Sequence, residues 1–247
     1  MSLLVTEKIE SGLQILCLNR VDKKNALNLE MYSLLSQALA RAQENESIKA
    51  TLLHGAGGNF SSGNDIDELA QPSEGMQAAL TFLNALTHYK KPIIAAVEGA
   101  SIGIGATLLL HCDMVISSRE ARFQFPFVKL GLVPEAASTY ILPRLLGHLK
   151  AFEILVLGET FHANVAYDMS MVNHLCEEGE AYDLALLYAV RIASLPSFSV
   201  QTTKRLLKRE VQPSLQTSLQ QESILFKESL ASNETQNTLK SFFLRPK

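Results

Sequence analysis

The sequence has no tryptophan, few cysteines, no long apolar run and no excess of basic residues. Its three cysteines are far apart and odd in number, which suggests neither a disulfide framework nor a structural zinc site. No stretch reaches the roughly 18 apolar residues that a transmembrane helix needs, and the apolar run in MSLLVTEKIE is too short for a signal peptide. A formal net charge of −3 gives no electrostatic case for binding nucleic acid. We therefore expect no metal, no nucleic acid and no membrane partner, and a location in the cytoplasm.

The remaining composition is typical of a globular protein. Hydrophobic residues make up 47% of the 247 residues and charged residues 19%. A chain of this length can bury a sizeable core, and it suits one large domain or one domain with an appendage.

Short apolar runs alternate with amphipathic stretches through most of the chain. The runs that indicate strands are 13–18, 50–55, 91–99 and 113–118, and the stretches that indicate helices are 28–43, 77–90 and 103–112. Asn28 can cap the first of these helices. Strands that alternate with helices are typical of an α/β architecture with mostly parallel pairing.

The pattern changes after about residue 190, where no strand-like run remains and the chain becomes more polar. This part predicts two or three helices. We therefore divide the chain into an α/β core at 1–190 and a helical region at 191–247. An apolar face of this helical region can pack on the core or on another subunit; it consists of Leu219, Ile224, Leu225, Phe226 and Leu230.

A glycine-rich loop, HGAGGNFSSGND, follows the second predicted strand at residues 54–65. Glycines expose backbone N–H groups and allow unusual φ values, and such loops bind anions or polarised oxygens. The other interpretation is a flexible turn between a strand and a helix. The loop lacks the Lys-Ser/Thr pair of a Walker A loop, and its glycine spacing does not fit a dinucleotide-binding fingerprint.

A second glycine-rich turn, GASIGIGATLLL at residues 99–110, joins an apolar strand to an apolar helix. The first N–H groups of a helix have no intrahelical acceptor, and the helix dipole places positive charge behind them. This turn is therefore a candidate for stabilising a developing oxyanion. Tight packing of strand against helix, which also needs small residues, is the alternative.

The same turn contains the pattern G-x-S-x-G around Ser101, which marks the nucleophile of α/β-hydrolases. A serine hydrolase is therefore a rival hypothesis, with HGAGG as its oxyanion loop. Its triad would need a histidine and an aspartate, and the candidates that follow are His148, His162, His174 and Asp168. None of them stands in a recognisable strand-end context, and we expect the histidines to be ordinary surface or core residues.

A lone carboxylate, Glu135, interrupts an apolar stretch, FVKLGLVPEAAS at residues 127–138. Pro134 suits the first turn of a helix, which would place Glu135 in that turn. There it could simply complement the helix dipole, which contributes about 0.3–1 kcal/mol. Apolar surroundings would raise its pKa, and a glutamate tuned in this way can transfer protons near neutral pH.

Taken together, these stretches resemble the crotonase family, also called the enoyl-CoA hydratase/isomerase superfamily. The resemblance covers nearly the whole chain and rests on four segments: NRVDKKNALN, FSSGNDIDEL, KPIIAAVEGASIGIGATLLLHCDMVISS and ARFQFPFVKLGLVPEAASTYILPRLLG. A departure lies at 158–175, where Ser170 or Met171 replaces the family's closing glycine. The resemblance implies a crotonase-like spiral of ββα units and C-terminal helices that build homo-trimers, often stacked into hexamers. It also implies an acyl-CoA thioester substrate and no cofactor, since the coenzyme A is part of the substrate.

The resemblance further implies roles for individual residues. The thioester oxygen would lie between the backbone N–H groups of Asn64 and Ile104, and Glu135 would be the catalytic base. The residues implied in substrate binding are Lys23, Lys24, Ala26, Ser62, Gly63, Asp65, Ile66, Gly103, Pro134 and Ser138. The lysines among them suit phosphate groups.

Two further positions bear on the reaction. Hydratases of the family use two glutamates, and this sequence has Thr107 and Phe127 at the matching places. Neither side chain can exchange a proton with water at neutral pH. Glu135 instead matches the single glutamate of the monofunctional Δ3-Δ2-enoyl-CoA isomerases, so we expect a shift of a 3-enoyl-CoA double bond to position 2. The alternatives are another crotonase reaction, including hydration, a non-catalytic acyl-CoA-binding scaffold, and the serine hydrolase.

Overall fold

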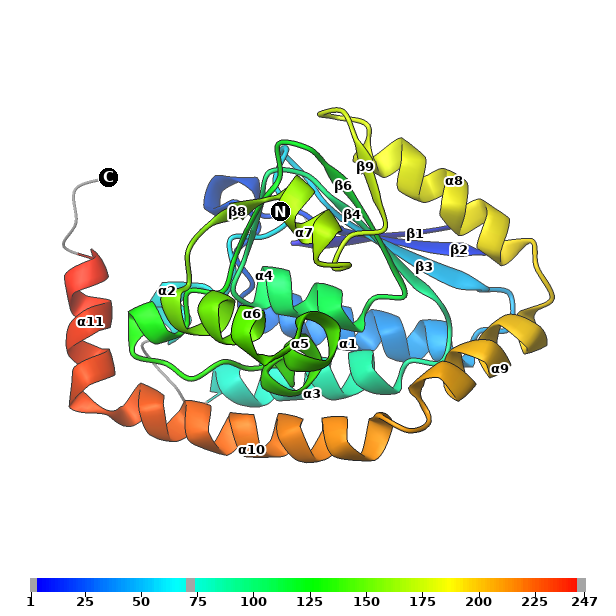
Figure 1. The fold of residues 1–247 in the computed structure, drawn as a ribbon. Coiled ribbons are helices and arrows are strands. Elements are labelled where there is room, and N and C mark those ends of the chain that lie inside the picture. Colours follow the sequence, from blue (N-terminus) through cyan, green and yellow to red (C-terminus); the bar gives the residue numbers. More distant parts are fainter. Residues whose placement is uncertain (1–3, 70–73, 244–247) are drawn as a thin grey trace.

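A computed structural model describes residues 4–69 and 74–243, and two β-sheets organise them (Figure 1). The larger sheet has the strand order β1-β2-β3-β4-β6-β9, and the smaller one β5-β7-β8. The larger sheet contains β1 (Val5–Glu10), β2 (Leu13–Leu18), β3 (Ala50–Gly55), β4 (Ile93–Val97), β6 (Met114–Ser118) and β9 (His174–Cys176). The smaller sheet contains β5 (Ala100–Ile102), β7 (Arg122–Gln124) and β8 (Phe161–His162).

Neighbouring strands of the larger sheet are parallel, with one exception. β1 and β2 form an antiparallel hairpin, closed by Ser11 and Gly12, which both have positive φ. From β2 to β9 every neighbouring pair is parallel. This confirms the α/β architecture with mostly parallel pairing that the alternation of apolar runs predicts.

Units of two strands and one helix wind through the chain. β4 is followed by β5 in the other sheet and then by helix α4 (Ile104–Thr107). β6 is followed in the same way by β7 and by a 3₁₀ helix, Val128–Leu130. Each unit adds one strand to each sheet before its helix, which is the spiral of ββα units that the resemblance implies.

The strand predictions are confirmed where the apolar runs are long. β2 and β3 span the predicted residues, and β4 and β6 lie within the predicted ranges. The apolar pattern does not predict β1, β5, β7, β8 and β9. β1 exposes five of its six residues, and the other four strands have only two or three residues, too few for a pattern to stand out.

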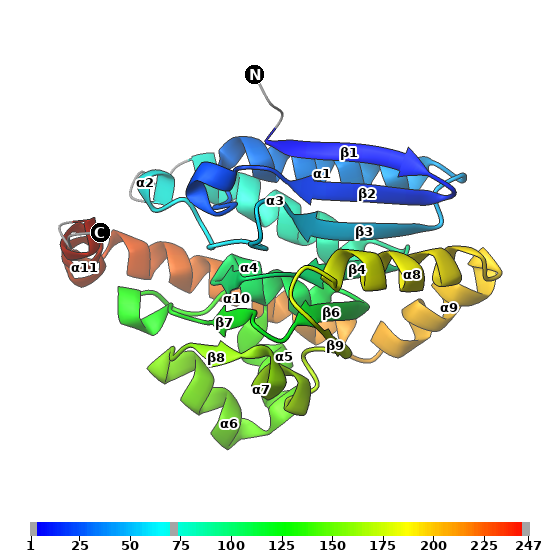
Figure 2. The same ribbon diagram turned by 90° about the horizontal axis from the view of Figure 1, so that it is seen from above.

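Helices cover both faces of the larger sheet (Figures 1 and 2). One face packs against α1 (Leu29–Glu44) and α3 (Glu74–His88), and the other against α8 (Ala181–Ala193). Asn28 caps α1 as predicted, because its side chain accepts the N–H of Met31 at 3.0 Å. α8 packs against the strands through small residues four positions apart, which lie on one side of the helix; they are Ala181, Ala185 and Ala189.

Shorter helices fill the space around the smaller sheet and the loops. They are α2 (Ile66–Leu69), α5 (Ser138–Leu146), α6 (His148–Phe152), α7 (Ala163–Asp168) and a π-helix, Glu153–Leu157. The helix predicted at 103–112 consists of α4 followed by a 3₁₀ helix, Leu108–His111. Within the described ranges, no single helix has the length and hydropathy to cross a membrane, although α8 and the next helix, α9 (Ser197–Lys208), together pass that test as a pair bent by 108°.

Three helices form the C-terminal region, within the number predicted: α9 (Ser197–Lys208), α10 (Gln212–Ala231) and α11 (Asn233–Phe243). α10 runs along α3 and α5 (Figure 1). Of its predicted apolar face, Leu219, Phe226 and Leu230 pack into the core, whereas Ile224 and Leu225 are exposed. The division of the chain at residue 190 stays a prediction, and its residues 1–3, 70–73 and 244–247 lie outside the described ranges.

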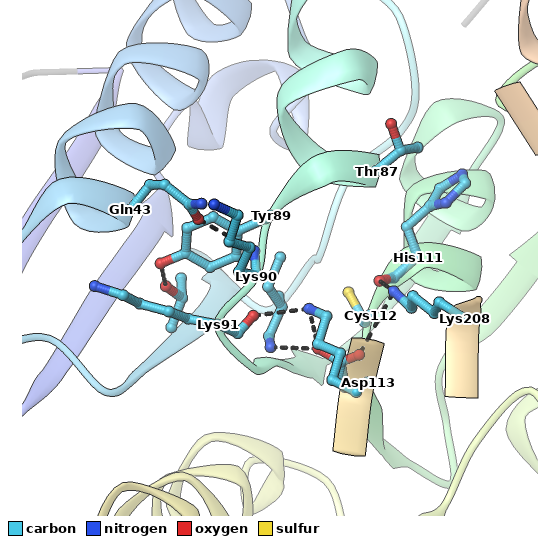
Figure 3. A network of polar contacts seen from close by, with 12 residues as sticks. Gln43, Thr87, Tyr89, Lys90, Lys91, His111, Cys112, Asp113 and Lys208 are labelled. Atoms are coloured by element: carbon cyan, nitrogen blue, oxygen red, sulfur yellow. Dashed lines mark hydrogen bonds and ion pairs between the residues drawn. The ribbon is translucent and has the colours of Figure 1, made fainter. Parts of the chain in front are cut away.

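A partly buried polar network attaches α9 to the core (Figure 3). Lys204 Nζ donates to the carbonyl oxygen of Lys91 at 2.7 Å and pairs with Asp113 at 2.6 Å. Lys208 Nζ lies 3.5 Å from the same carboxylate and donates to the carbonyl oxygen of His111 at 3.3 Å. The network therefore connects the start of the C-terminal region to the residues that follow α4.

Candidate active site

The two glycine-rich segments of the sequence lie side by side in the structure. Ser61 and Ser101 form a parallel bridge, in which the N–H of Ser61 donates to Ala100 at 2.8 Å and the N–H of Ile102 donates to Ser61 at 3.0 Å. This contact depends on Gly105, because a Cβ atom there would lie 2.7 Å from the carbonyl oxygen of Ser61. The absence of a side chain thus allows the two segments to meet.

A second bridge, between Leu27 and Asn64, fixes the end of the first segment. The N–H of Leu27 donates to the carbonyl oxygen of Gly63 at 2.7 Å, and the N–H of Asp65 donates to the carbonyl oxygen of Leu27 at 2.8 Å. In a parallel ladder, the residue between two such bonds turns its own N–H to the opposite side. The N–H of Asn64 therefore points away from Leu27.

Ile104 is the first residue of α4 and follows Gly103, which has a φ of 56°. The carbonyl oxygen of Gly103 accepts the N–H groups of Ala106 and Thr107, both at 2.9 Å, whereas Ile104 stands too early in the helix for an intrahelical acceptor. In the described part of the chain, neither Asn64 nor Ile104 has an acceptor for its backbone N–H. Two backbone donors from adjoining segments are therefore available to an oxygen atom of a ligand.

An apolar pocket of about 670 Å³, counted with its open mouth, includes Asn64 and Glu135 in its lining. Most of its wall comes from apolar side chains of α1, α3 and α10, namely Leu29, Met76, Ala79, Leu80, Leu83, Leu219, Phe226 and Leu230. A hollow with apolar walls and few polar groups is typical of a small-molecule site, and its lining suits a hydrocarbon chain.

Glu135 places a buried carboxyl group in this pocket. Its side chain is 9% exposed, and its Oε1 accepts the Thr107 hydroxyl at 2.9 Å. Burial raises the pKa of Glu135 from 4.5 to about 7, while the hydrogen bond from Thr107 lowers the pKa and the negative charge of Glu222 raises it. A carboxyl group with this pKa can accept and return a proton near neutral pH.

Two other carboxylates line the pocket, and both are engaged by partners. Asp65 is buried and pairs with Arg20 at 2.6 Å. Glu68 accepts the backbone N–H of Leu29 at 2.7 Å. Glu135 thus differs from both in having a hydroxyl group as its hydrogen-bond partner.

The prediction that Glu135 lies in the first turn of a helix is wrong. Ala136 and Ala137 follow it with φ values of 59° and 55°, in the left-handed region that a right-handed helix of L-residues does not contain. The helix α5 begins only at Ser138. The apolar pocket, and not a helix dipole, therefore sets the environment of the carboxyl group.

A wider groove adjoins the pocket and shares Asn64, Asp65 and Phe226 with it. The predicted substrate-binding residues that line this groove are Lys23, Lys24, Ala26, Ser62, Gly63, Asp65, Ile66 and Gly103. Lys23 is exposed and pairs with Asp67 at 3.2 Å. Residues of α11 also line the groove, namely Asn237, Thr238 and Ser241.

The remaining predicted residues, Ile104, Pro134 and Ser138, do not form the walls of the pocket or of the groove, which are together called the two hollows below. Ile104 and Ser138 are fully buried, and Pro134 is half-buried in the chain segment before Glu135. None of these three side chains lines the pocket or the groove. Of these three residues, Ile104 is the one that could bind a ligand, and it could do so through its backbone N–H group and not its side chain.

Several residues that shape the site have no clear signal in the sequence. Asn25 is fully buried although it stands in a polar loop, and its amide donates to the carbonyl oxygens of Ala56 and Asn59 at 2.8 and 2.7 Å. Tyr32 donates its hydroxyl to Asn64 Oδ1 and lines the pocket. Tyr32 could have been found, because its spacing to Leu35 places it on the buried face of α1.

Ser101 is not placed as the nucleophile of a hydrolase. Its side chain is fully buried in β5, and its hydroxyl donates to the carbonyl oxygen of Gly105 at 2.9 Å. His148 and His162 are exposed, and His174 stacks on Tyr188 with 4.6 Å between ring centroids. Among the described residues, no group of three or more His, Cys, Asp or Glu side chains forms a possible metal site.

Comparison with known proteins gives the family. A family model described as enoyl-CoA hydratase/isomerase matches residues 8–247. Enoyl-CoA delta isomerase 2 of Rattus norvegicus is 32% identical over 244 residues, which are 96% of this chain and 62% of that protein. (E)-benzylidenesuccinyl-CoA hydratase of Thauera aromatica is 34% identical over 208 residues, which are 81% of this chain and 80% of that protein.

A solved structure supports the same family. The structure of Pseudomonas aeruginosa OdaA has a TM-score of 0.95 and 40% sequence identity to this chain, with 99% of this chain and 100% of that one covered. The match extends over both sheets and the C-terminal helices, so the crotonase-like fold is confirmed. The chain belongs to the enoyl-CoA hydratase/isomerase family, whose members act on CoA thioesters.

Proposed function

We propose that this protein is a Δ3-Δ2-enoyl-CoA isomerase in which Glu135 moves the proton. The observation that carries the proposal is the buried Glu135 carboxyl group, with a pKa of about 7, in an apolar pocket whose lining also includes Asn64. A single group of this kind suffices for an isomerisation, because no water is added to the substrate.

The proposed reaction begins with a 3-enoyl-CoA whose acyl chain lies in the pocket. The Glu135 carboxylate removes a proton from C2, and the electrons of that C–H bond form an enolate with its negative charge on the thioester oxygen. The backbone N–H groups of Asn64 and Ile104 stabilise this oxygen, and each such donor can lower the barrier by about 2.7–4 kcal/mol. Glu135 then returns the proton to C4, so that the double bond moves to C2–C3 and the carboxylate is regenerated.

The surroundings of Glu135 favour isomerisation over hydration. Hydration in this family would use two glutamates where this chain has Thr107 and Phe127, and the hydroxyl of Thr107 instead donates to Glu135. The relatives include both an enoyl-CoA delta isomerase and a hydratase, so the family alone does not decide between the two reactions. The argument for an isomerase therefore rests on the side chains in the pocket.

The coenzyme A part of the substrate would lie in the groove, where Lys23 and Lys24 offer positive charge to its phosphate groups. No separate cofactor enters this scheme. Location in the cytoplasm stays a prediction.

We also propose that the chain forms a trimer, or a hexamer built from trimers. Large apolar side chains are exposed on α8, α9 and α10, which is typical of surfaces that bind another protein. They are Leu187, Val190, Phe198, Leu206, Leu207, Ile224 and Leu225. Sedimentation of the purified protein tests this point, since a monomer would contradict it.

The first experiment follows the ultraviolet absorbance of the conjugated thioester formed from 3-enoyl-CoA substrates of several chain lengths. Wild type should give product, Glu135→Gln should lose about 10²–10⁴-fold in turnover, and the exposed control Glu120→Gln should match wild type. Binding of a saturated acyl-CoA to Glu135→Gln should be retained.

Other outcomes identify the alternatives. No product from wild type with any chain length contradicts the isomerase. Hydration of a 2-enoyl-CoA supports another reaction of the family, and a thermal shift with CoA thioesters but no product supports a binding scaffold. Labelling of Ser101 by a fluorophosphonate would support the hydrolase.

A further inference from the structure

A second buried carboxyl group, Glu222 on α10, lies behind the turn that carries Glu135. Its side chain is 5% exposed. Its Oε1 accepts the backbone N–H of Thr139 at 2.9 Å and also the Thr139 hydroxyl. Its Oε2 is buried and has no partner in the part of the chain that the structure describes. A carboxylate is costly to bury, so a buried one that leaves an oxygen unpaired requires an explanation.

The partner of Glu222 stands next to a strained segment. Thr139 is the second residue of α5 and is separated by Ser138 alone from Ala136 and Ala137, whose φ values are 59° and 55°. Non-glycine residues in this region cost free energy and persist only where the surroundings hold them. The two bonds from Thr139 to Glu222 fix the chain where it leaves this segment.

The other end of the same segment is held by His111. Its Nε2 lies 2.8 Å from the carbonyl oxygen of Ala136. Burial lowers the pKa of His111 to about 4, so the ring is neutral at pH 7 and donates one N–H to this carbonyl group. His111 is in turn held by Lys208 in the network of Figure 3. The turn that carries Glu135 is therefore fixed from two sides, by the residues after α4 and by α10.

We propose that Glu222 is a positioning residue for Glu135: by holding Thr139, it fixes the Ala136–Ala137 turn and so aims the Glu135 carboxyl group into the apolar pocket. The proposal rests on the proposed function of Glu135. It gives α10 two roles at the site, because the same helix supplies Leu219, Ser223, Phe226 and Leu230 to the pocket wall.

Glu222 also acts on Glu135 through its charge. Burial raises the pKa of Glu222, and its hydrogen bonds with Thr139 oppose this effect. The charge of Glu222 contributes to the raised pKa of Glu135. Other ionisable groups around Glu135 are Tyr32 on α1, whose pKa burial raises well above 10, Glu68 on α2, Asp65 paired with Arg20, and the neutral His111.

The test compares Glu222→Ala, Glu222→Gln and a control on the exposed side of the same helix, Glu228→Gln. Glu222→Ala should lose up to about 10²-fold in kcat, the loss expected for a misplacement of about 1 Å, while the Kd of a saturated acyl-CoA should change little. Glu222→Gln keeps an oxygen acceptor for Thr139 and should recover most of kcat. Its pH profile should move to lower pH, because a negative charge beside Glu135 is lost. Glu228→Gln should match wild type.

Two results would overturn the proposal. One is a folded Glu222→Ala variant with the kcat and pH profile of wild type. The other is a parallel loss of kcat, acyl-CoA binding and thermal stability, which would show a general structural role. If Glu222→Ala does not fold, Thr139→Val removes one of the two hydrogen bonds and should lower kcat in the same direction; an unchanged kcat would then count against the proposal.

A measurement without substrate separates this proposal from the proposed reaction. The carboxyl carbon of Glu135 can be followed by ¹³C NMR during a pH titration and identified by its loss in Glu135→Gln. A midpoint that moves to lower pH in Glu222→Gln supports the coupling of the two residues, even if no 3-enoyl-CoA is turned over. An unchanged midpoint overturns the coupling, even if the isomerase activity is present.

Discussion

The pocket and the groove meet at Asn64 but offer a ligand opposite surroundings. The pocket has apolar walls and one carboxyl group whose pKa burial raises to about 7. The groove has exposed lysines, backbone groups and the polar side chains of α11. A charged group stays hydrated and screened in such a groove, whereas burial in the pocket changes its protonation. Under the proposed function, the groove would bind the charged carrier while the pocket keeps the pKa of the carboxyl group near neutrality.

The largest effect should come from disturbing the junction of the two hollows. In Gly105→Ala, the added Cβ would lie 2.7 Å from the backbone oxygen of Ser61, so the two glycine-rich segments must move apart. Displacing a backbone oxyanion donor typically costs about 10²–10³-fold in kcat, and we expect a loss of that size in the absorbance assay. Gly179→Asn is the control, since a Cβ at Gly179 meets nothing within 4 Å and asparagine tolerates positive φ. Full activity in Gly105→Ala would show that the contact does not position the donors.

The next effect concerns the free energy of unfolding and depends on the burial of Glu135 in the pocket. As the pH rises from 4.5 to about 7, the Glu135 carboxyl ionises in the unfolded chain first, so the folded state binds more protons and stability falls. Above about pH 7 this loss of folding free energy is complete. It amounts to roughly 3 kcal/mol, because each unit of pKa difference between the folded and unfolded states corresponds to about 1.4 kcal/mol. Glu135→Gln lacks this penalty. Urea unfolding near pH 4.5 and above pH 7 should therefore show its advantage over wild type growing with pH, and a constant difference would contradict the burial argument.

A smaller effect is expected from the hydroxyl group that faces Glu135. Thr107→Val removes the 2.9 Å hydrogen bond, which lowers the pKa of Glu135 in wild type. The pKa should therefore rise further, and kcat/KM at neutral pH should fall roughly 10-fold, as for a bond of about 1.5 kcal/mol to a charged group. Activity should recover at higher pH. An equal loss at every pH would point to a change of shape instead, and the exposed Thr217→Val provides the control.

The smallest effect should appear in the groove. Lys23→Ala and Lys24→Ala should each raise KM by about 2–5-fold without changing kcat, because exposed charge pairs contribute only about 0.2–1 kcal/mol. The difference from wild type should shrink at high salt. Lys150→Ala is the matched control, since Lys150 on α6 pairs with Glu153 at the start of the π-helix and does not line the groove. A loss of kcat in the groove variants would contradict the division of roles between the two hollows.

The sequence predicts those parts of the fold that depend on long apolar runs. The strands at 13–18 and 50–55 and the helix capped by Asn28 follow from local periodicity. The smaller sheet does not, because β5, β7 and β8 have two or three residues each and pair only once the spiral places them together. The left-handed turn at Ala136 and Ala137 is also beyond such a prediction, since alanine disfavours that conformation.

The residues of the candidate site also fall into two groups: those that local motifs predict and those that only the packing of the helices brings together. Local motifs draw attention to Asn64, Ile104 and Glu135, and the structure brings Asn64 and Glu135 to one pocket. Nothing near Glu222 in the sequence connects it with Glu135, which stands 87 positions earlier. Contacts of this kind arise from the packing of α10 against α5, which a single sequence does not reveal.

The place of α10 and α11 also bears on the biosynthesis of the protein. α10 completes the wall of the pocket and α11 part of the groove, and both follow every strand of the two sheets in the chain. Chains generally fold from the N-terminus as they are made, so both sheets can form while each hollow still lacks one side. A nascent chain that has released everything up to α9 would therefore contain all strands of both sheets but lack one side of each hollow, and we expect it to bind ligand only after α10 and α11 have followed.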